Sequence, residues 1–275
     1  VLMIPPALLL VVFFVLPMIL MASYSFREGS FGAARQRWTL DHYRQFLQSG
    51  SFQHLLWRST IVALETSLYC VILAYPVAYY LAFQAGPKRL ALLTLIIAPA
   101  WTSFLLRVLA WKLILGSEGL LSSLLLSLGL LREPSPLLLY SRAAVVVALT
   151  YSWVPFVVLP IFAALDRIDR NLLEAAADLG CAPWQAFLRV TLPLSMPGVA
   201  AGFAFVFIPT LGEWVTPALV GGVKGVMYGN IIQDQFARAL NWPMGSLMSF
   251  VMLLLTLIIV LLVARFVRVM RLVEL

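Results

Sequence analysis

The sequence is poor in charge: only 11% of its 275 residues are Asp, Glu, Lys or Arg, whereas 62% are hydrophobic. Soluble domains carry about 25% charged and about 45–50% apolar residues. The 19 basic and 12 acidic side chains could not cover a globule with this much apolar material, so a water-soluble protein is excluded. The net charge of +7 is spread over short connections rather than gathered in a basic stripe, which excludes a nucleic-acid-binding protein.

Cysteine and histidine are also scarce. Cys70 lies in an apolar segment and Cys181 in a polar connection, so no disulfide framework is expected. His42 and His54 have no cysteine or carboxylate pattern around them, which predicts no metal site. The sequence lacks a phosphate loop of the type G-x-x-x-x-G-K-[ST], so we do not expect the chain to bind nucleotide through such a loop.

Long hydrophobic runs are what the sequence has instead. A bilayer core of about 30 Å needs roughly 20 apolar residues in a helix. We therefore predict an all-α integral membrane protein with a single transmembrane domain over 1–275. Its six predicted transmembrane helices are 1–22, 59–84, 91–114, 140–165, 197–219 and 246–264.

Three features of these segments need interpretation. The first run begins at Val1, so we expect the natural N-terminus further upstream, and Phe26-Arg27-Glu28 is no signal-peptidase site. Segment 120–131 is apolar but too short to span, which favours an interfacial or re-entrant helix. Prolines in the spans fit either kinked packing or a mobile pathway; they are Pro17, Pro76, Pro99, Pro155, Pro160, Pro209 and Pro217.

The basic residues predict the orientation, because cytoplasmic connections are enriched in Lys and Arg. Connections 85–90 and 166–196 and the tail 265–275 carry 8 basic residues in 48 positions. The connections on the other side carry 8 in 87. We therefore expect both termini in the cytoplasm.

The cytoplasmic connection 166–196 reads as two short helices. Asp169 can cap the first helix, which Gly180 would end. Pro183 can open the second, and we expect Pro193 and Pro197 to stop it before the fifth span. The apolar faces of the pair fit packing on the chain's own spans or the membrane surface, or docking to a soluble partner.

A four-part pattern lies in this connection: Glu174-Ala175-Ala176, three residues, Gly180, nine residues, Val190, one residue, Leu192-Pro193. It resembles the EAA loop of permease subunits of binding-protein-dependent ABC importers, whose pattern is E-A-A, three residues, G, nine residues, I-x-L-P. Val190 in place of Ile is a departure that keeps a β-branched side chain. Similarity to the polyamine (spermidine/putrescine) permease branch extends over roughly 1–265, in Ile208–Pro217, Gly221-Gly222, Gly229-Asn230, Asn241–Pro243, Leu106-Arg107, Ala110-Trp111 and Gly119.

The resemblance implies a type I ABC importer permease (MetI-like) architecture with kinked spans. The loop 166–196 would be the cytoplasmic coupling loop, seated in a groove on an ATPase subunit. The coupling residues it implies are Glu174, Ala175, Ala176, Asp178, Gly180, Val190, Leu192 and Pro193. The chain itself would then be no enzyme and would bind no cofactor, since ATP and Mg would be held by the partner ATPase.

The resemblance also implies the assembly. A bacterial inner-membrane complex is expected, with a second permease subunit (a paralogue), two ATP-binding subunits and an extracytoplasmic solute-binding protein. That receptor would dock on 23–58, 115–139 and 220–245. The solute implied is a polyamine such as spermidine or putrescine.

Ionisable residues inside spans are candidates for function because their burial in lipid is costly. Glu65 and Glu213, beside the aromatic Trp214, Tyr151 and Trp153, would suit a polycation through charge and cation–π contacts. Glu65 could instead pair with another charge, for which Arg107, Lys112 and Arg142 are available. The tryptophans of the outer side, Trp101, Trp111 and Trp153, fit an interfacial belt better than a ligand cage.

The sequence fits three other classes of membrane protein less well. A membrane-embedded enzyme would need a catalytic pair or metal cluster within the spans, and both histidines lie outside them. A channel would need a filter motif, which is not found. A stand-alone secondary transporter of a small organic cation is the closer alternative, but it usually shows internal repeats and would not need the two-helix loop.

Overall fold

The computed structural model describes residues 8–30, 37–130, 133 and 139–273. In these ranges the chain is helical, and the only strand-like feature is an isolated antiparallel bridge between Arg27 and Trp38. The predicted all-α class is therefore confirmed.

The helical segments that precede Thr102 are η1 (Val11–Val15), α2 (Leu16–Ser25), α3 (Asp41–Gln48), α4 (Gly50–Phe83), η2 (Gly86–Lys88), α5 (Arg89–Ile97) and η3 (Ala98–Trp101). Those after it are α6 (Phe104–Ile114), α7 (Leu120–Ser127), α8 (Arg142–Leu165), α9 (Arg170–Asp178), α10 (Pro183–Ala186), η4 (Phe187–Thr191), α11 (Leu192–Leu211), η5 (Pro217–Gly221), α12 (Gly222–Gly225), α13 (Tyr228–Ala237) and α14 (Trp242–Val273).

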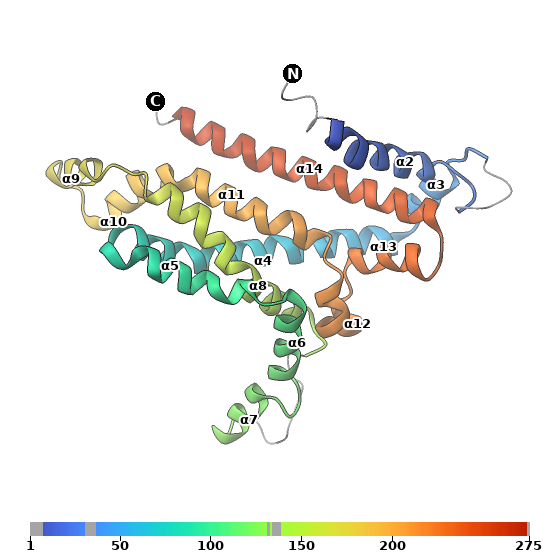
Figure 1. Ribbon diagram of the computed structural model, residues 1–275, viewed down its shortest axis with the longest axis horizontal. Helices are drawn as coiled ribbons and strands as arrows, with labels where there is room; N and C mark the ends of the chain where they lie inside the picture. Colours follow the sequence, from blue (N-terminus) through green and yellow to red (C-terminus); the bar gives the residue numbers. More distant parts are fainter. Residues whose placement is uncertain (1–7, 31–36, 131–132, 134–138, 274–275) are drawn as a thin grey trace.

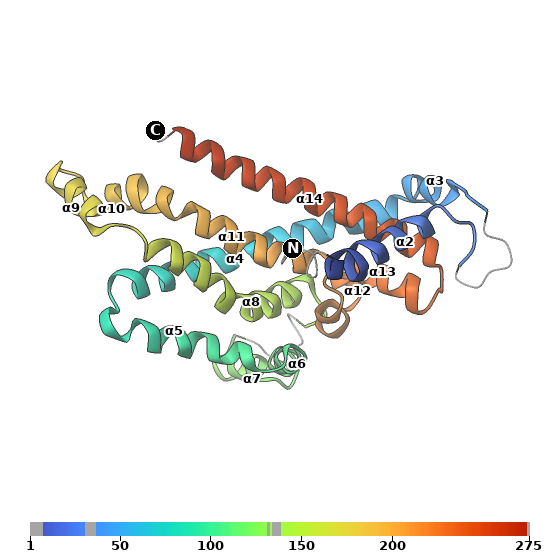
Figure 2. The ribbon, with the colours of Figure 1, turned by 45° about the horizontal axis from the view of Figure 1, so that its top comes forward.

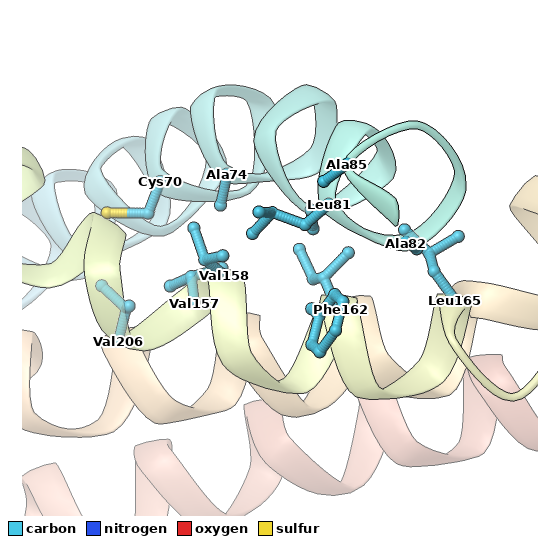
Figure 3. Close-up of a cluster of buried hydrophobic side chains, with 12 residues drawn as sticks. Cys70, Ala74, Leu81, Ala82, Ala85, Val157, Val158, Phe162, Leu165 and Val206 are labelled. Carbon is cyan, nitrogen blue, oxygen red and sulfur yellow. The ribbon is translucent and has the colours of Figure 1, made fainter. Parts of the chain in front are cut away.

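Helices α4, α8 and α11 pack on one another and form the centre of the molecule, with α14 and α2 along one side (Figures 1 and 2). The largest core cluster joins the three central helices through Cys70, Ala74, Leu81, Val157, Phe162 and Val206 (Figure 3). Small residues allow the close approach of α8 and α11, because Gly198 of α11 lies against Pro160 and Ala164. The core is thus held together by close contact of the α8 and α11 backbones as well as by the packing of large side chains.

Five described helices are long and apolar enough to cross a membrane: Leu8–Ser25, Gly50–Phe83, Arg142–Leu165, Pro183–Leu211 and Trp242–Arg265. A sixth crossing exists only as a broken pair, Gly86–Trp101 and Phe104–Ile114, bent by 84°. The predicted span 91–114 is therefore present as two helices with a sharp bend between them, and not as a single helix. The break lies at Thr102 and Ser103, where the backbone turns extended after the 3₁₀ segment that contains Pro99.

The other predicted spans match helices with shifted ends. The second span begins at Gly50 rather than 59, and the sixth helix begins at Trp242 rather than 246. The fourth predicted span, 140–165, coincides with α8 to within two residues. The first predicted span is 1–22, of which residues 1–7 lie outside the described part of the chain. The described helix extends beyond the predicted end, to Ser25.

The fifth span differs most from its prediction of 197–219. The helix starts at Pro183 and ends at Leu211, so Pro193 and Pro197 do not stop it, contrary to the prediction. A π-helical turn at Phe187–Thr191 precedes Pro193. This wider turn relieves the clash that a proline ring makes with the carbonyl group four residues earlier.

The short apolar segment predicted at 120–131 forms α7 over Leu120–Ser127; Leu131 lies outside the described residues. Helices α6 and α7 extend away from the central helices (Figure 1). Most of the leucines on this arm are exposed, including Leu113 and Leu120. The segment is too short to span, as predicted, and its apolar surface fits a position in the membrane interface.

Candidate coupling loop and substrate cavities

The first helix of the loop, α9, is capped at both ends by its own sequence. At the N-terminus the Asp169 carboxylate accepts a hydrogen bond from the Asn171 N–H at 3.0 Å. At the C-terminus the Cys181 N–H donates to the Ala176 carbonyl at 3.0 Å and the Gly180 N–H to the Ala177 carbonyl at 2.9 Å. This bonding needs a left-handed residue, and Gly180 has φ of +82°. The predicted cap and glycine exit are confirmed.

The EAA residues face different surroundings. Glu174, Ala175 and Asp178 are exposed, whereas Ala176 is buried against the rest of the chain. Ala176 therefore helps to pack α9 against the rest of this chain, whereas Ala175 is a small residue on the exposed surface of the helix. Leu172 on the same helix and Leu179, which directly follows it, are also exposed.

The second helix of the loop is continuous with the fifth span. Pro183 occupies its first turn, and the Gln185 side chain accepts a hydrogen bond from the Ala182 N–H at 3.0 Å. Val190 lies in the π-turn, and Leu192 and Pro193 begin α11. The three are half-buried. The second half of the loop is consequently a helical extension of a spanning helix, whereas α9 is a separate helix (Figure 1).

The predicted pathway residues point to a larger and a smaller cavity. The larger cavity has a volume of about 1040 Å³ and lies between α4, the end of α5, α6 and α8. It contains two of the predicted pathway residues, Glu65 and Tyr151. Glu65 forms an ion pair with Arg142, so its charge is already balanced. Tyr151 meets Trp111 edge to face, with ring centroids 5.5 Å apart.

A smaller cavity of about 360 Å³ contains two more, Glu213 and Trp153, together with Phe104, Phe156 and Arg107. Glu213 follows the end of α11, and its Oε1 accepts hydrogen bonds from the N–H groups of Val215 at 2.8 Å and Thr216 at 3.1 Å. These bonds fix the carboxylate in the non-helical break before η5. The fifth predicted residue, Trp214, lines neither cavity; its carbonyl accepts a hydrogen bond from the Asn230 side chain at 2.7 Å.

Arg107 links the two cavities, since it lines both. Its Nη1 donates to the Ser152 carbonyl at 3.0 Å. For charge pairing, sequence reasoning offered Arg107 as one possible partner of Glu65, a role that the structure gives to Arg142. In the described part of the chain, Arg107 Nε and Trp153 Nε1 are buried without a protein acceptor, so both can donate to water or to a bound molecule.

Sequence reasoning missed the aromatic lining of the smaller cavity and the π-turn. Phe104 and Phe156 are ordinary apolar residues of predicted spans, and nothing in their spacing distinguishes them from lipid-facing ones. Among the described residues, no group of three His, Cys, Asp or Glu side chains is placed to hold a metal ion.

Comparison with known proteins gives concordant results. The model of the family "Binding-protein-dependent transport system inner membrane component" matches residues 1–274. The spermidine/putrescine transport system permease protein PotB of Escherichia coli K12 is 37% identical over 243 residues, which covers 87% of each chain. PotB of Haemophilus influenzae is 35% identical and covers 87% of this chain and 84% of its own.

The fold is shared with a solved ABC transporter. A chain of a bacterial alginate ABC transporter, crystallised with an alginate-bound periplasmic protein, superposes with a TM-score of 0.74 at 18% identity, covering 95% of this chain and 91% of the other. The predicted architecture of an ABC importer permease is thereby confirmed. This protein belongs to the family of inner membrane components of binding-protein-dependent transport systems.

Proposed function

We propose that this chain is a permease subunit of an ATP-driven importer that carries a polyamine such as spermidine or putrescine across the bacterial inner membrane. The observation that supports this most directly is the identity of 37%, over 87% of both chains, with a permease of spermidine and putrescine transport. The cavities and the coupling loop supply the physical basis.

The coupling loop provides the mechanical input. The chain lacks a phosphate loop for nucleotide, so the energy of ATP has to arrive from a partner as movement. Helix α9 is short, capped at both ends and exposed at Glu174 and Ala175. A packed element of this kind moves as a unit. Glu174 is available to pair with a basic residue of the ATPase.

The smaller cavity is the better candidate contact for an amine. Glu65 is paired with Arg142, whereas the Glu213 carboxylate accepts hydrogen bonds from backbone N–H groups and forms no ion pair with any residue that the structure describes. Trp153, Phe104 and Phe156 line the same cavity, as does Arg107. A cationic amine would meet a carboxylate on one side and aromatic faces on the other, which is a recognised arrangement for cation binding.

The proposal includes the partners. One chain supplies half of a pathway, so a second permease, a paralogue, completes it. Two ATP-binding subunits that hold ATP and Mg bind the coupling loops, and an extracytoplasmic solute-binding protein docks at the opposite end. We place both termini in the cytoplasm, a choice supported by the basic connections and by α9 and the C-terminal end of α14 lying toward the same end of the molecule (Figure 1).

Purification from native membranes in mild detergent, with mass spectrometry of the bound proteins, tests the assembly. We expect an ATP-binding subunit and a second permease in stoichiometric amounts. Vesicles containing that complex should accumulate labelled spermidine or putrescine only with ATP. The double variant Glu174→Lys/Ala175→Trp should abolish uptake without loss of the folded chain. A chain that purifies alone and takes up solute from an ion gradient would instead be a secondary transporter and would overturn the proposal.

A further inference from the structure

An aromatic contact joins the coupling loop to the second spanning helix. The ring of Phe187, the first residue of η4, meets two tyrosines of α4 edge to face. Its centroid lies 5.7 Å from that of Tyr75 and 6.0 Å from that of Tyr79. Such perpendicular arrangements are the favoured geometry of aromatic pairs. Phe187 therefore lies between two successive turns of α4.

A hydrogen bond joins the same two helices about two turns further along the fifth span. The hydroxyl groups of Tyr75 and Ser195 are 2.8 Å apart. Ser195 also donates to the Leu192 carbonyl at 2.9 Å, so Tyr75 is the donor in the bond between them. Ser195 is fully buried. Tyr75 thus contacts the fifth span both through its ring, at Phe187, and through its hydroxyl group.

Phe187 is the first residue of a π-helical turn. Phe187–Thr191 is the only segment of π-helix between α9 and Leu211. Such turns inside α-helices are frequently found at functional sites. Helix α9 packs against both α10 and η4. A displacement of α9 is therefore passed directly to the turn that carries Phe187.

Helix α4 is weakened where Phe187 meets it. Pro76 lies between Tyr75 and Tyr79 in the sequence. A proline inside a helix removes one backbone hydrogen bond, and sharp bends occur at such sites. Ten residues before Tyr75, α4 contributes Glu65 to the larger cavity, and Tyr69 lines it in between. A bend at Pro76 therefore changes the position of those cavity residues.

We propose that Phe187 is a positioning residue that transmits movement of the coupling loop to α4, bending α4 at Pro76 and so changing the larger cavity. This inference rests on the proposed function, since it assumes an ATPase that moves α9. Phe187 touches neither nucleotide nor solute in this scheme. It acts through Tyr75 and Tyr79.

The test uses the complete transporter in lipid vesicles, with its ATPase subunits and receptor, and spermidine as the probe. Uptake and ATP hydrolysis are measured in parallel, so that the ratio of solute to ATP is obtained. For Phe187→Ala we expect ATP hydrolysis within about twofold of the unchanged complex and at least a tenfold loss of uptake. Phe187→Tyr should restore the ratio, because it keeps the ring.

A control variant separates this role from general packing. Phe203 lies on the same spanning helix, and its ring stacks on Phe207 of that helix at 5.7 Å. Phe203→Leu removes an aromatic pair of similar spacing remote from the coupling loop and should leave the ratio unchanged. Equal ratios for Phe187→Ala and the unchanged complex would overturn the proposal. So would parallel losses of uptake and hydrolysis accompanied by a lower melting temperature.

A second measurement does not depend on the solute. Spin labels at Leu68→Cys on α4 and Val147→Cys on α8, in a chain with Cys70→Ala and Cys181→Ser, report the separation of two helices that line the larger cavity. We expect ATP with vanadate to shift this distance in the complex that keeps Phe187 and to leave it unchanged with Phe187→Ala. A shift of equal size in both would overturn the role of Phe187. Absence of ATP-dependent spermidine uptake in the unchanged complex, with the shift present, would contradict only the polyamine assignment.

Discussion

Glu65 of α4 forms an ion pair with Arg142, the first residue of α8. The pair joins two of the three central helices at the larger cavity. Both side chains are only partly exposed, 38% for Glu65 and 37% for Arg142. The charge of Glu65 is therefore used within the protein, which favours a structural role for it.

A double-mutant cycle measures that role. Glu65→Gln and Arg142→Gln each remove one partner and leave the other charge uncompensated, so both single variants should be destabilised. The double variant should lose less than the sum, with a coupling free energy of about 1 kcal/mol or less, as expected for a partly solvated pair. Denaturant unfolding in detergent provides the measurement.

The charge-reversed pair is the control for this cycle. Glu65→Arg combined with Arg142→Glu should retain spermidine uptake if the pair is structural. Loss of uptake in this variant, with stability intact, would mean that the carboxylate of Glu65 contacts the solute directly.

The close contact of α8 and α11 at Gly198 gives a second prediction. A methyl group at position 198 would lie 2.5 Å from both the Ala164 Cβ and the Pro160 carbonyl oxygen. Gly198→Ala should therefore force the helices apart and destabilise the protein by about 1–3 kcal/mol, which exceeds the gain of about 1 kcal/mol in helix propensity. The melting temperature in detergent checks it.

Gly50→Ala is the matched control, because no atom lies within 4 Å of a methyl group built at that helix start. It should leave the melting temperature nearly unchanged. Similar stability of the Gly198→Ala and Gly50→Ala variants would show that the two helices are not in close contact in the membrane.

Hydropathy predicted the spanning helices well where an apolar segment forms one helix without a change of direction. The fourth span is apolar throughout and starts after Ser141, whose side chain accepts a hydrogen bond from the Ala144 N–H at 3.1 Å. Prediction and structure there differ by two residues. Over 91–114 hydropathy located the apolar segment but missed its bend, because it counts apolar residues and contains no information on a change of direction at Thr102 and Ser103.

The site could be predicted in part. The caps of α9 depend on neighbouring residues, so Asp169 and Gly180 identified them. The path of the chain past Pro193 and Pro197 depends on a π-turn and on packing against α4, neither of which is encoded by local propensity. The pairing of Glu65 had three candidates, and choosing Arg142 required the relative positions of α4 and α8.

The left-handed exit of α9 gives a third prediction. Gly180 has φ of +82° and open space where a side chain would lie, so a substitution there causes backbone strain and no clash. Gly180→Ala should weaken the end of the helix by about 1–2 kcal/mol. Hydrogen exchange of the Cys181 amide, which bonds to the Ala176 carbonyl, should then accelerate by a factor of about 5–30.

Gly180→Asn is the comparison, since asparagine adopts the left-handed conformation more readily than alanine. It should show a smaller acceleration and better retained ATP-dependent uptake. Equal exchange rates in the two variants would show that backbone conformation at position 180 does not determine the stability of the loop.

Glu213 gives the fourth prediction, on substrate recognition. Its Oε1 caps the Val215 and Thr216 N–H groups. Glu213→Gln keeps a carbonyl oxygen for these bonds and removes only the charge. If the carboxylate binds an amine, its loss should cost about 1.5–3 kcal/mol, as for a hydrogen bond to a charged group. The half-saturating concentration of spermidine should then rise by roughly tenfold or more, as measured by uptake at varied receptor-bound spermidine.

Glu213→Leu serves as the structural comparison for this variant. It removes the charge and the backbone cap together, so it should reduce both uptake and the melting temperature, while Glu213→Gln keeps the melting temperature. The two variants separate the effects of charge and capping. Glutamine loses the charge but keeps an oxygen that can cap the N–H groups, whereas leucine loses both. An unchanged half-saturating concentration in a stable Glu213→Gln transporter would exclude Glu213 as an amine contact. The second permease would then be the next place to look for an acidic group that binds the solute, since Glu65 is paired with Arg142.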